Sequence, residues 1–205
     1  MKKILITGSR GRIGTDLKDF LKNDYEILEF EKGDELSDDK FKVNSVIHLA
    51  ALTPKKEKKF SLKEYIETNV ELTKKVLFYS SKNNVKTVII PTSWSWMFKL
   101  GNYQYSKILQ EKVAQKYRDV GLNVITIEFP EVINKGYKGI IKILADRIKN
   151  KQETVVDSVN ISTMTTEAIA KVFSGFIEGE AEKANNVYKN SINVFDLYEE
   201  VKKII

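Results

Sequence analysis

The sequence predicts an α/β protein built on a doubly wound parallel sheet and completed by a small C-terminal lobe. Short apolar runs and amphipathic stretches alternate from residue 3 to residue 129, as they do when helices cover both faces of a parallel sheet. A glycine-rich turn joins the first apolar run to the first stretch with helical spacing. With 205 residues and 42% hydrophobic content, the chain is long enough for one sizeable core.

The first strand is predicted at Lys3–Thr7, and the first helix ends near Leu21. In the turn between them, Gly8 stands where a side chain would clash, Gly11 where the backbone must approach a pyrophosphate, and Gly14 where the helix lies close to the strand. The N–H groups at the start of the helix can then hold phosphate charge. The turn therefore predicts a Rossmann-type dinucleotide site formed by Gly8, Ser9, Arg10, Gly11, Arg12, Ile13 and Gly14.

The second strand is predicted at Tyr25–Glu31 and ends in an acid. A carboxylate there can accept hydrogen bonds from a ribose diol and would repel the extra phosphate of NADP, so Glu31, or Glu29 if the strand ends earlier, favours NAD. Basic residues close by could instead neutralise that phosphate, so NADP stays possible; they are Arg10, Arg12 and Lys32.

The stretch Lys32–Lys42 is too short for the strand and helix that a standard doubly wound sheet places there. A buried strand follows at Val43–Ala51, and its small residues at the end would let a cofactor pass close. His48 is the only histidine, and because it lies inside this apolar run we expect a packed core histidine rather than a catalytic one.

The rest of the chain continues the alternation and then becomes less regular. Further elements are predicted as one long or two joined helices over 61–83, a strand over 85–91, a helix over 102–117 and a strand over 123–129. Beyond them we expect a helix over 138–149, extended chain over 154–161, a helix over 166–176, a strand over 186–188 and a helix over 194–204. We expect residues 1–130 to bind the dinucleotide and residues 131–205 to form a small substrate-binding lobe on the sheet edge.

Tyr103 and Lys107 lie four residues apart and so share one face of the predicted helix. A phenol is a poor base at neutral pH, but a neighbouring ammonium stabilises the phenolate and makes it a usable acid or base. Ser93, at the end of a strand ten residues upstream, could orient the same substrate oxygen. These residues, Ser93, Tyr103 and Lys107, are the predicted catalytic group.

Taken together, these motifs resemble an extended short-chain dehydrogenase/reductase of the NAD-dependent epimerase/dehydratase family, in a shortened form. The matching segments occur in the family's order along nearly the whole chain. They are Thr7–Gly14, Glu31, Gly33-Asp34, Val46–Ala51, Asn69-Val70, Pro91-Thr92-Ser93, Tyr103 with Lys107, and Phe129-Pro130.

The resemblance implies specific roles. In the family, the residue that matches Asp34 contacts the adenine. Tyr103 would be the acid/base, and Lys107 would bind the nicotinamide ribose and adjust the pKa of Tyr103. Ser93 would hydrogen-bond the reacting oxygen. Members typically act on nucleotide-diphosphate sugars, taking hydride from a sugar carbon and then returning it, eliminating water, or stopping as reductases. The remaining cofactor contacts implied are at Leu49, Ala50, Ala51, Asn69, Tyr103, Lys107 and Pro130.

The chain departs from the family pattern in three respects. It is shorter than typical members, and it lacks the third-strand region and part of the substrate lobe. The interval from Ser93 to Tyr103 is tighter than usual and contains Trp94 and Trp96. Phe129 precedes Pro130 where the family has arginine.

Composition argues against several other classes. The chain has no cysteine and a single histidine, so we expect no metal site. The net charge of +6 comes from basic residues spread along the chain, with one denser cluster at residues 55–59, so we expect no nucleic-acid binding. No run is long enough for a membrane span, and the apolar stretch before Gly8 is too short for a signal peptide, so we expect a cytoplasmic protein.

The leading hypothesis is an NAD(P)-dependent epimerase, dehydratase or reductase that acts on a sugar nucleotide or a related hydroxy/keto substrate. The alternative is a cofactor-binding module without turnover, serving as a redox sensor or partner subunit. A homodimer that pairs the 61–83 and 102–117 helices is possible, although covering the sheet accounts for the same apolar residues.

Overall fold

The computed structural model describes residues 1–37, 41–56, 58–93, 101–129, 131–133, 140–152, 160–180, 191–193 and 199. The chain forms two compact units, Met1–Phe129 and Pro130–Ile205. The division predicted from the sequence, into a dinucleotide-binding part over 1–130 and a substrate-binding lobe over 131–205, remains a prediction.

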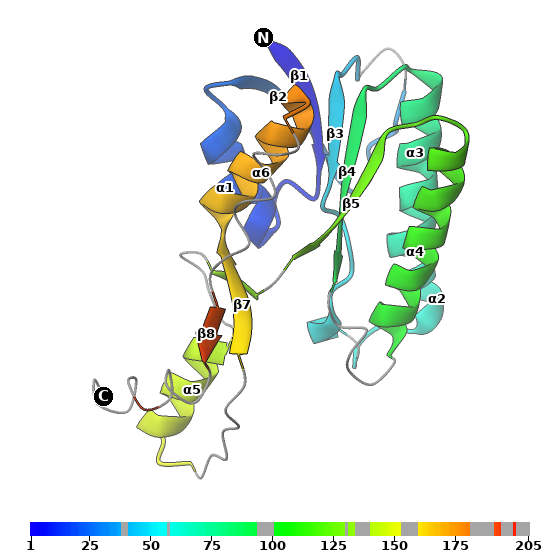
Figure 1. Ribbon diagram of the computed structural model, residues 1–205. Helices are drawn as coiled ribbons and strands as arrows, with labels where there is room; N and C mark the ends of the chain where they lie inside the picture. The colour runs from blue at the N-terminus through cyan, green and yellow to red at the C-terminus, as the bar shows by residue number, and fades with distance from the viewer. Residues whose placement is uncertain are drawn as a thin grey trace. The chain divides into compact units, whose positions relative to one another are not determined.

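The first unit is a five-stranded sheet in the order β2-β1-β3-β4-β5, and all its strand pairs are parallel. Helix α1 lies on one face, and α3 and α4 lie on the other (Figure 1). The doubly wound parallel sheet predicted from the sequence is thus confirmed. Its elements are β1 (Lys2–Thr7), α1 (Arg12–Leu21), β2 (Tyr25–Phe30), β3 (Ser45–His48), η1 (Pro54–Lys56), α2 (Leu62–Tyr65), η2 (Ile66–Glu71), α3 (Leu72–Lys82), β4 (Thr87–Ser93), α4 (Asn102–Asp119) and β5 (Val124–Phe129).

The strand order reverses direction between β1 and β3, because the chain first adds β2 on one side of β1 and then adds β3, β4 and β5 on the other. Thr7 pairs with Phe30 on β2 and with His48 on β3, so the carboxyl ends of these strands are level. In open α/β sheets the ligand binds outside the carboxyl ends of the strands at this reversal point. Gly8, Glu31 and Leu49 follow directly on the three strands and therefore lie at that edge.

The core on the α3 and α4 side forms because alternate strand residues face the helices. Leu5, Val46 and Val88 of the sheet are fully buried there against Val76 and Leu77 of α3. Complete burial of an aliphatic side chain of this size contributes about 1.5–3 kcal/mol. This packing fixes the plane of the sheet on which the site is built.

The long stretch predicted over 61–83 is one continuous helical run that contains a π-helical segment, η2. It begins with a capping box, in which Ser61 Oγ accepts from the backbone of Glu64 and the Glu64 carboxylate accepts from the backbone of Ser61. The wider turn of η2 carries Asn69, which is fully buried. π-helical turns are frequent at functional sites.

The second unit contains a three-stranded sheet in the order β6-β7-β8 with one parallel and one antiparallel pair. Of the extended chain expected over 154–161, residues 154–159 lie outside the described residues, and Asn160 and Ile161 belong to β7. Strand β6 was not predicted. The strand predicted over 186–188 and nearly all of the helix over 194–204 lie outside the described residues. The elements are β6 (Glu131–Ile133), α5 (Ile140–Lys149), β7 (Asn160–Thr165), α6 (Thr166–Glu178) and β8 (Ser191–Asn193).

Candidate functional site

The turn from β1 to α1 can be made only with glycine at two of its positions. Gly8 has φ +70°, and a Cβ added to it would lie 2.8 Å from the backbone nitrogen of Ala50. A Cβ on Gly14 would lie 2.4 Å from the carbonyl oxygen of Gly8. The Gly11 N–H donates to that same carbonyl at 3.0 Å and closes the turn. The backbone is therefore packed as closely as the sequence motif requires.

The N-terminus of α1 is open to an anion. Gly11 occupies the N-cap position, no side chain caps the helix, and its first turn contains no acidic residue. The N–H groups of a helix start and the positive end of its dipole both favour negative charge. The residues at this position thus fit the diphosphate of a dinucleotide.

Two carboxylates lie at the end of β2 and share one hydroxyl group. Ser9 Oγ is 2.5 Å from Glu29 Oε2 and also forms a short hydrogen bond with Glu31. The Ser9 hydrogen bond, assisted by Lys18, lowers the pKa of the Glu29 carboxyl. Arg10, one of the basic residues that could neutralise a 2′-phosphate, lies 3.9 Å from the Glu31 carboxylate.

Asp34 shapes the turn that follows Glu31. Its side chain accepts from the Glu31 N–H at 2.8 Å, and its own N–H donates to the Glu31 carbonyl at 3.0 Å. Gly33, with φ +102°, supplies the left-handed conformation that this turn needs. The predicted adenine-contacting residue is thus held beside the predicted ribose-binding acid.

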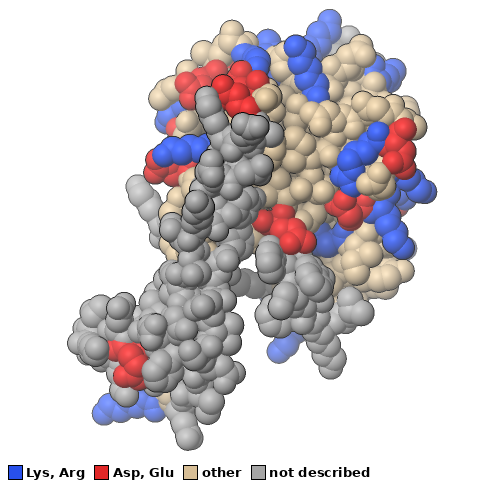
Figure 2. Space-filling model, in the orientation of Figure 1, with Lys and Arg blue, Asp and Glu red and all other residues tan. Residues whose placement is uncertain are grey.

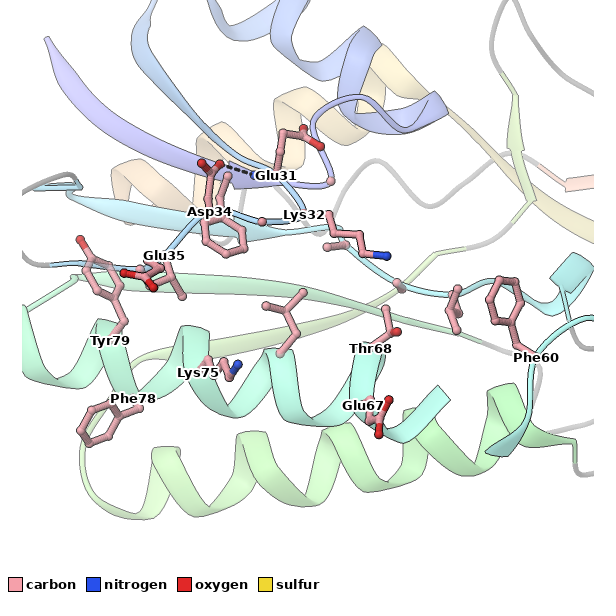
Figure 3. Close-up of a pocket in the computed structure, with 18 of the residues that line it drawn as sticks. Glu31, Lys32, Asp34, Glu35, Phe60, Glu67, Thr68, Lys75, Phe78 and Tyr79 are labelled. Carbon is pink, nitrogen blue, oxygen red and sulfur yellow. Dashed lines mark hydrogen bonds between the residues drawn. The ribbon is translucent and has the colours of Figure 1, made fainter. Parts of the chain in front are cut away.

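A groove of about 1120 Å³ opens at this end of the sheet. Glu31 and Asp34 lie on one side of it, and Lys75, Phe78 and Tyr79 of α3 lie on the other (Figure 3). Five predicted site residues line it, namely Gly8, Glu31, Asp34, Ala50 and Ala51.

The loop after β3 is fixed from both sides. Leu49 N donates to the Thr7 carbonyl at 3.1 Å and Ala50 N to Thr7 Oγ1 at 3.1 Å. Both ends of the Asn69 amide bind Leu52, since Oδ1 accepts from its N–H at 2.7 Å and Nδ2 donates to its carbonyl at 3.1 Å. The Asn69 amide therefore positions the groove-lining loop, and its predicted contact with the cofactor remains a prediction.

Tyr103 and Lys107 are neighbours on α4, with the ammonium 5.9 Å from the centre of the Tyr103 ring. The Tyr103 side chain is 8% exposed and meets the Tyr65 ring edge-on at 6.5 Å between centroids. Leu52 and Phe60 pack in the same cluster and also line the groove, so Tyr103 lies directly behind the groove wall.

Lys107 ties this pair to the carboxyl end of β4. Its ammonium donates to the Pro91 carbonyl at 2.9 Å and to Gln110 Oε1 at 2.7 Å. Burial lowers the pKa of Lys107 to about 8. Ser93 ends β4 two residues after Pro91; the position of its side chain, like all of Pro130, lies outside what the structure describes.

His48 is a core residue, as the sequence predicts. It is 2% exposed, its Nδ1 lies 2.7 Å from Thr7 Oγ1, and its Nε2 lies 2.9 Å from Thr73 Oγ1. Burial, with a smaller effect from the charge of Lys107, lowers the pKa of His48 to about 3, so the ring is neutral.

Sequence reasoning missed Thr7, Thr73 and Gln110, which bind His48 and Lys107 in the interior. Only the spacing of three residues between Lys107 and Gln110 could have indicated one of these contacts. The others join positions far apart in the chain, and no local pattern predicts them.

Among the described residues there is no second candidate site made of clustered charges or metal ligands. On the face seen in Figure 2, Lys and Arg side chains are interspersed with Asp and Glu. No group of three or more potential metal-ligating side chains occurs among the described residues. None of the helices described is long and apolar enough to cross a membrane.

Solved structures share this fold across nearly the whole chain. The Bordetella bronchiseptica enzyme WbmH in complex with NAD+ has a TM-score of 0.76 and 16% identity, covering 97% of this chain and 80% of its own. UDP-N-acetylglucosamine 4-epimerase of Methanobrevibacter ruminantium in complex with UDP-N-acetylmuramic acid gives 0.76 and 18%, covering 99% and 82%. MoeE5 in complex with UDP-glucose and NAD gives 0.74 and 17%, covering 98% and 81%.

Sequence comparison identifies the family of this chain. The chain matches none of the curated proteins in sequence. The profile of the NAD dependent epimerase/dehydratase family matches residues 4–164, which is well over half of the chain. The chain therefore belongs to the NAD dependent epimerase/dehydratase family.

Proposed function

We propose that this protein is an NAD(P)-dependent enzyme of the short-chain dehydrogenase/reductase type that acts on a nucleotide-diphosphate sugar or a related hydroxy/keto substrate. One observation carries the proposal. The Lys107 ammonium lies 5.9 Å from the centre of the Tyr103 ring and is itself bonded to the Pro91 carbonyl, so the pair belongs to the same sheet edge as the glycine turn. Similar folds solved with NAD and UDP-glucose support the choice of ligands.

The cofactor would lie with its diphosphate at the N-terminus of α1 and its adenosine in the groove beside Glu31 and Asp34. The acid pair of Glu29 and Glu31 favours NAD over NADP, because a 2′-phosphate there would meet negative charge. When bound, the nicotinamide supplies hydride transfer to or from the substrate carbon.

Two residues of the chain would carry out the proton transfer that accompanies hydride transfer. Lys107, in its ammonium form, stabilises the Tyr103 phenolate, and Tyr103 then exchanges a proton with the substrate oxygen. The edge contact with Tyr65 restricts the Tyr103 ring. The substrate itself would bind against the second unit, residues 131–205.

The test incubates the wild type and Tyr103→Phe with NAD and a panel of sugar nucleotides. Nicotinamide fluorescence measures the rate at which the cofactor is reduced or oxidised. We expect the variant to lose at least about 100-fold in rate while retaining NAD binding, because only the proton-exchanging hydroxyl is removed. Tyr105→Phe is the matched control, since Tyr105 lies on the same helix and is 47% exposed; its rate should equal that of the wild type.

Two results would count against the proposal. Equal losses in the Tyr103 and Tyr105 variants would show that the hydroxyl of Tyr103 has no special role. Tight NAD binding without turnover of any substrate in the panel would favour a non-catalytic cofactor-binding module instead.

A further inference from the structure

The Lys107 side chain is partly buried, and its ammonium is held by neutral groups. Its described hydrogen-bond acceptors are the Pro91 carbonyl and the Gln110 side-chain amide. Gln110 is 1% exposed. A buried ammonium usually has a carboxylate partner, because an unpaired charge is costly to remove from water. The uncharged partner at this position is therefore a feature that needs an explanation.

The orientation of the Gln110 amide is fixed by Thr73. The Thr73 hydroxyl has one proton and donates it to the Asn69 carbonyl at 2.7 Å. Thr73 Oγ1 can then only accept, and it does so from Gln110 Nε2 at 2.7 Å. The nitrogen of the amide must face Thr73, so its oxygen must face Lys107.

His48 completes the same chain of hydrogen bonds. Because Thr73 Oγ1 accepts, His48 Nε2 carries the ring proton and donates it at 2.9 Å. His48 Nδ1 then accepts from the Thr7 hydroxyl at 2.7 Å, and Thr7 Oγ1 accepts from Ala50 N at 3.1 Å. A continuous chain of hydrogen bonds between neutral groups, buried except at its two ends, thus links the groove-lining loop to Lys107.

We propose that Gln110 is a positioning residue for the reaction inferred above: its amide oxygen holds the Lys107 ammonium beside Tyr103 without neutralising it, and Thr73, whose proton goes to the Asn69 carbonyl, sets the direction of that amide. This role in catalysis rests on the proposed function, in which Tyr103 and Lys107 carry out the proton exchange. A carboxylate at position 110 would form an ion pair with Lys107 and cancel the positive charge that the Tyr103 phenolate requires. An apolar side chain would leave the ammonium without its second partner.

Few titratable groups face Lys107 in the described part of the structure. Tyr103 shares its helix, and neutral His48 approaches from β3. Glu111, the nearest carboxylate in the sequence, binds Arg118 and lies 3.3 Å from Thr126. A change in the protonation of Lys107 on mutation of Gln110 can therefore be assigned to that substitution.

The experiment follows the titration of Lys107 by NMR of the intact chain labelled with 13C at the lysine ε-carbons, its signal assigned with Lys107→Arg. The wild-type midpoint is expected near pH 8. In Gln110→Glu the midpoint should rise by about one pH unit or more, because an opposite charge favours the ammonium. In Gln110→Met, which keeps the side-chain length, it should fall, because an acceptor is lost.

Gln115→Glu is the matched control, since Gln115 is an exposed residue of the same helix, and it should leave the midpoint unchanged. Should one of the Gln110 variants fail to fold, the other still has a required direction. The alkaline limb of the rate profile should move with the midpoint in each variant.

Midpoints that stay at the wild-type value, or that move in the same direction in both Gln110 variants, would overturn the proposal. A wild type that turns over no substrate would remove the proposed function, and the opposite shifts would then still support Gln110 as the residue that sets the state of Lys107. The two failures are thus distinguishable.

Discussion

At the scale of single residues, the hydroxyl group of Ser9 lies between the carboxylates of Glu29 and Glu31. One proton cannot serve both acids at once, and although Lys18 binds Glu29 and Arg10 lies near Glu31, each carboxylate has further lone pairs that can accept from another donor. A ribose diol offers two such donors. We propose that the pair accepts an unphosphorylated ribose and opposes a phosphorylated one.

Removing this pair should weaken discrimination against NADP. We expect Glu31→Gln alone to have a modest effect, because Glu29 remains within reach of Ser9, and the double variant with Glu29→Gln to change the ratio of the NADP and NAD dissociation constants by at least about tenfold. Calorimetric titration with each cofactor measures this ratio. Glu26→Gln, an exposed position on the same strand, should leave it unaltered; if the double variant behaves likewise, the acids do not select the cofactor.

His48 should give the protein a pH-dependent stability that can be isolated. The unfolded chain takes up a proton near pH 6.5, whereas the folded chain, in which the pKa of His48 is about 3, does not. The free energy of unfolding should therefore fall as the pH drops below 6.5, with a slope of at most about 1.4 kcal/mol per pH unit.

Between pH 6.5 and 5 few carboxylates titrate, and His48 is the only histidine. Urea unfolding of His48→Asn should therefore show almost no slope in this range. Parallel curves for the wild type and the variant would mean that the imidazole is not held neutral. The imidazole also links Thr7 to Thr73, so the variant should be less stable at neutral pH as well.

At the scale of elements, the close approach of α1 to the end of β1 makes the glycine turn intolerant of a single methyl group. Gly14→Ala would place its Cβ 2.4 Å from a backbone oxygen, so α1 must move. We expect a loss of about 2 kcal/mol or more in stability and a clear loss of NAD affinity, since the phosphate-binding N–H groups move with the helix.

Gly121→Ala separates these two effects. Gly121 has φ +92° and nothing within 4 Å of an added Cβ, so the substitution strains the backbone without a clash. Chemical denaturation should show that it loses stability, while fluorescence titration should show wild-type NAD affinity. An equal loss of affinity in both variants would mean that global stability, not the position of α1, controls binding.

These elements also show how far sequence reasoning reaches. Glycine spacing and hydrophobic periodicity predicted the β1–α1 turn and the parallel sheet, because both are local patterns. The π-helical segment was not predicted, since the periodicity of 62–82 reads as ordinary helix on either side of it. β6, with three residues, is too short to produce a pattern. The interior hydrogen bonds of Thr73 and Gln110 depend on strand order and helix register, which no single segment contains.

At the scale of the whole molecule, exposed apolar side chains on the helices of the first unit are consistent with self-association. Tyr105 and Ile108 are three residues apart on α4 and are 47% and 40% exposed, and Leu62 of α2 is 38% exposed. The proposed homodimer would bury such residues between copies of the chain.

Sedimentation velocity at micromolar concentration should show a dimer for the wild type and a monomer for Ile108→Glu, because the introduced carboxylate would be buried without a partner. Val120→Glu, at a 74% exposed position after the end of α4, should sediment like the wild type. A wild type that sediments only as a monomer would remove this proposal.

The neutral surroundings of Lys107 have a consequence for the behaviour of the protein in different media. At 0.1 M ionic strength the Debye length is about 10 Å, so interactions between exposed charges farther apart than this are largely screened. Dissolved ions also weaken the ion pairs of the surface. The described partners of Lys107 are a carbonyl and an amide without net charge, so the hydrogen bonds that hold its ammonium depend little on screening. We therefore expect the pKa of Lys107 to change little between low and high salt, although salt weakens the ion pairs of the surface.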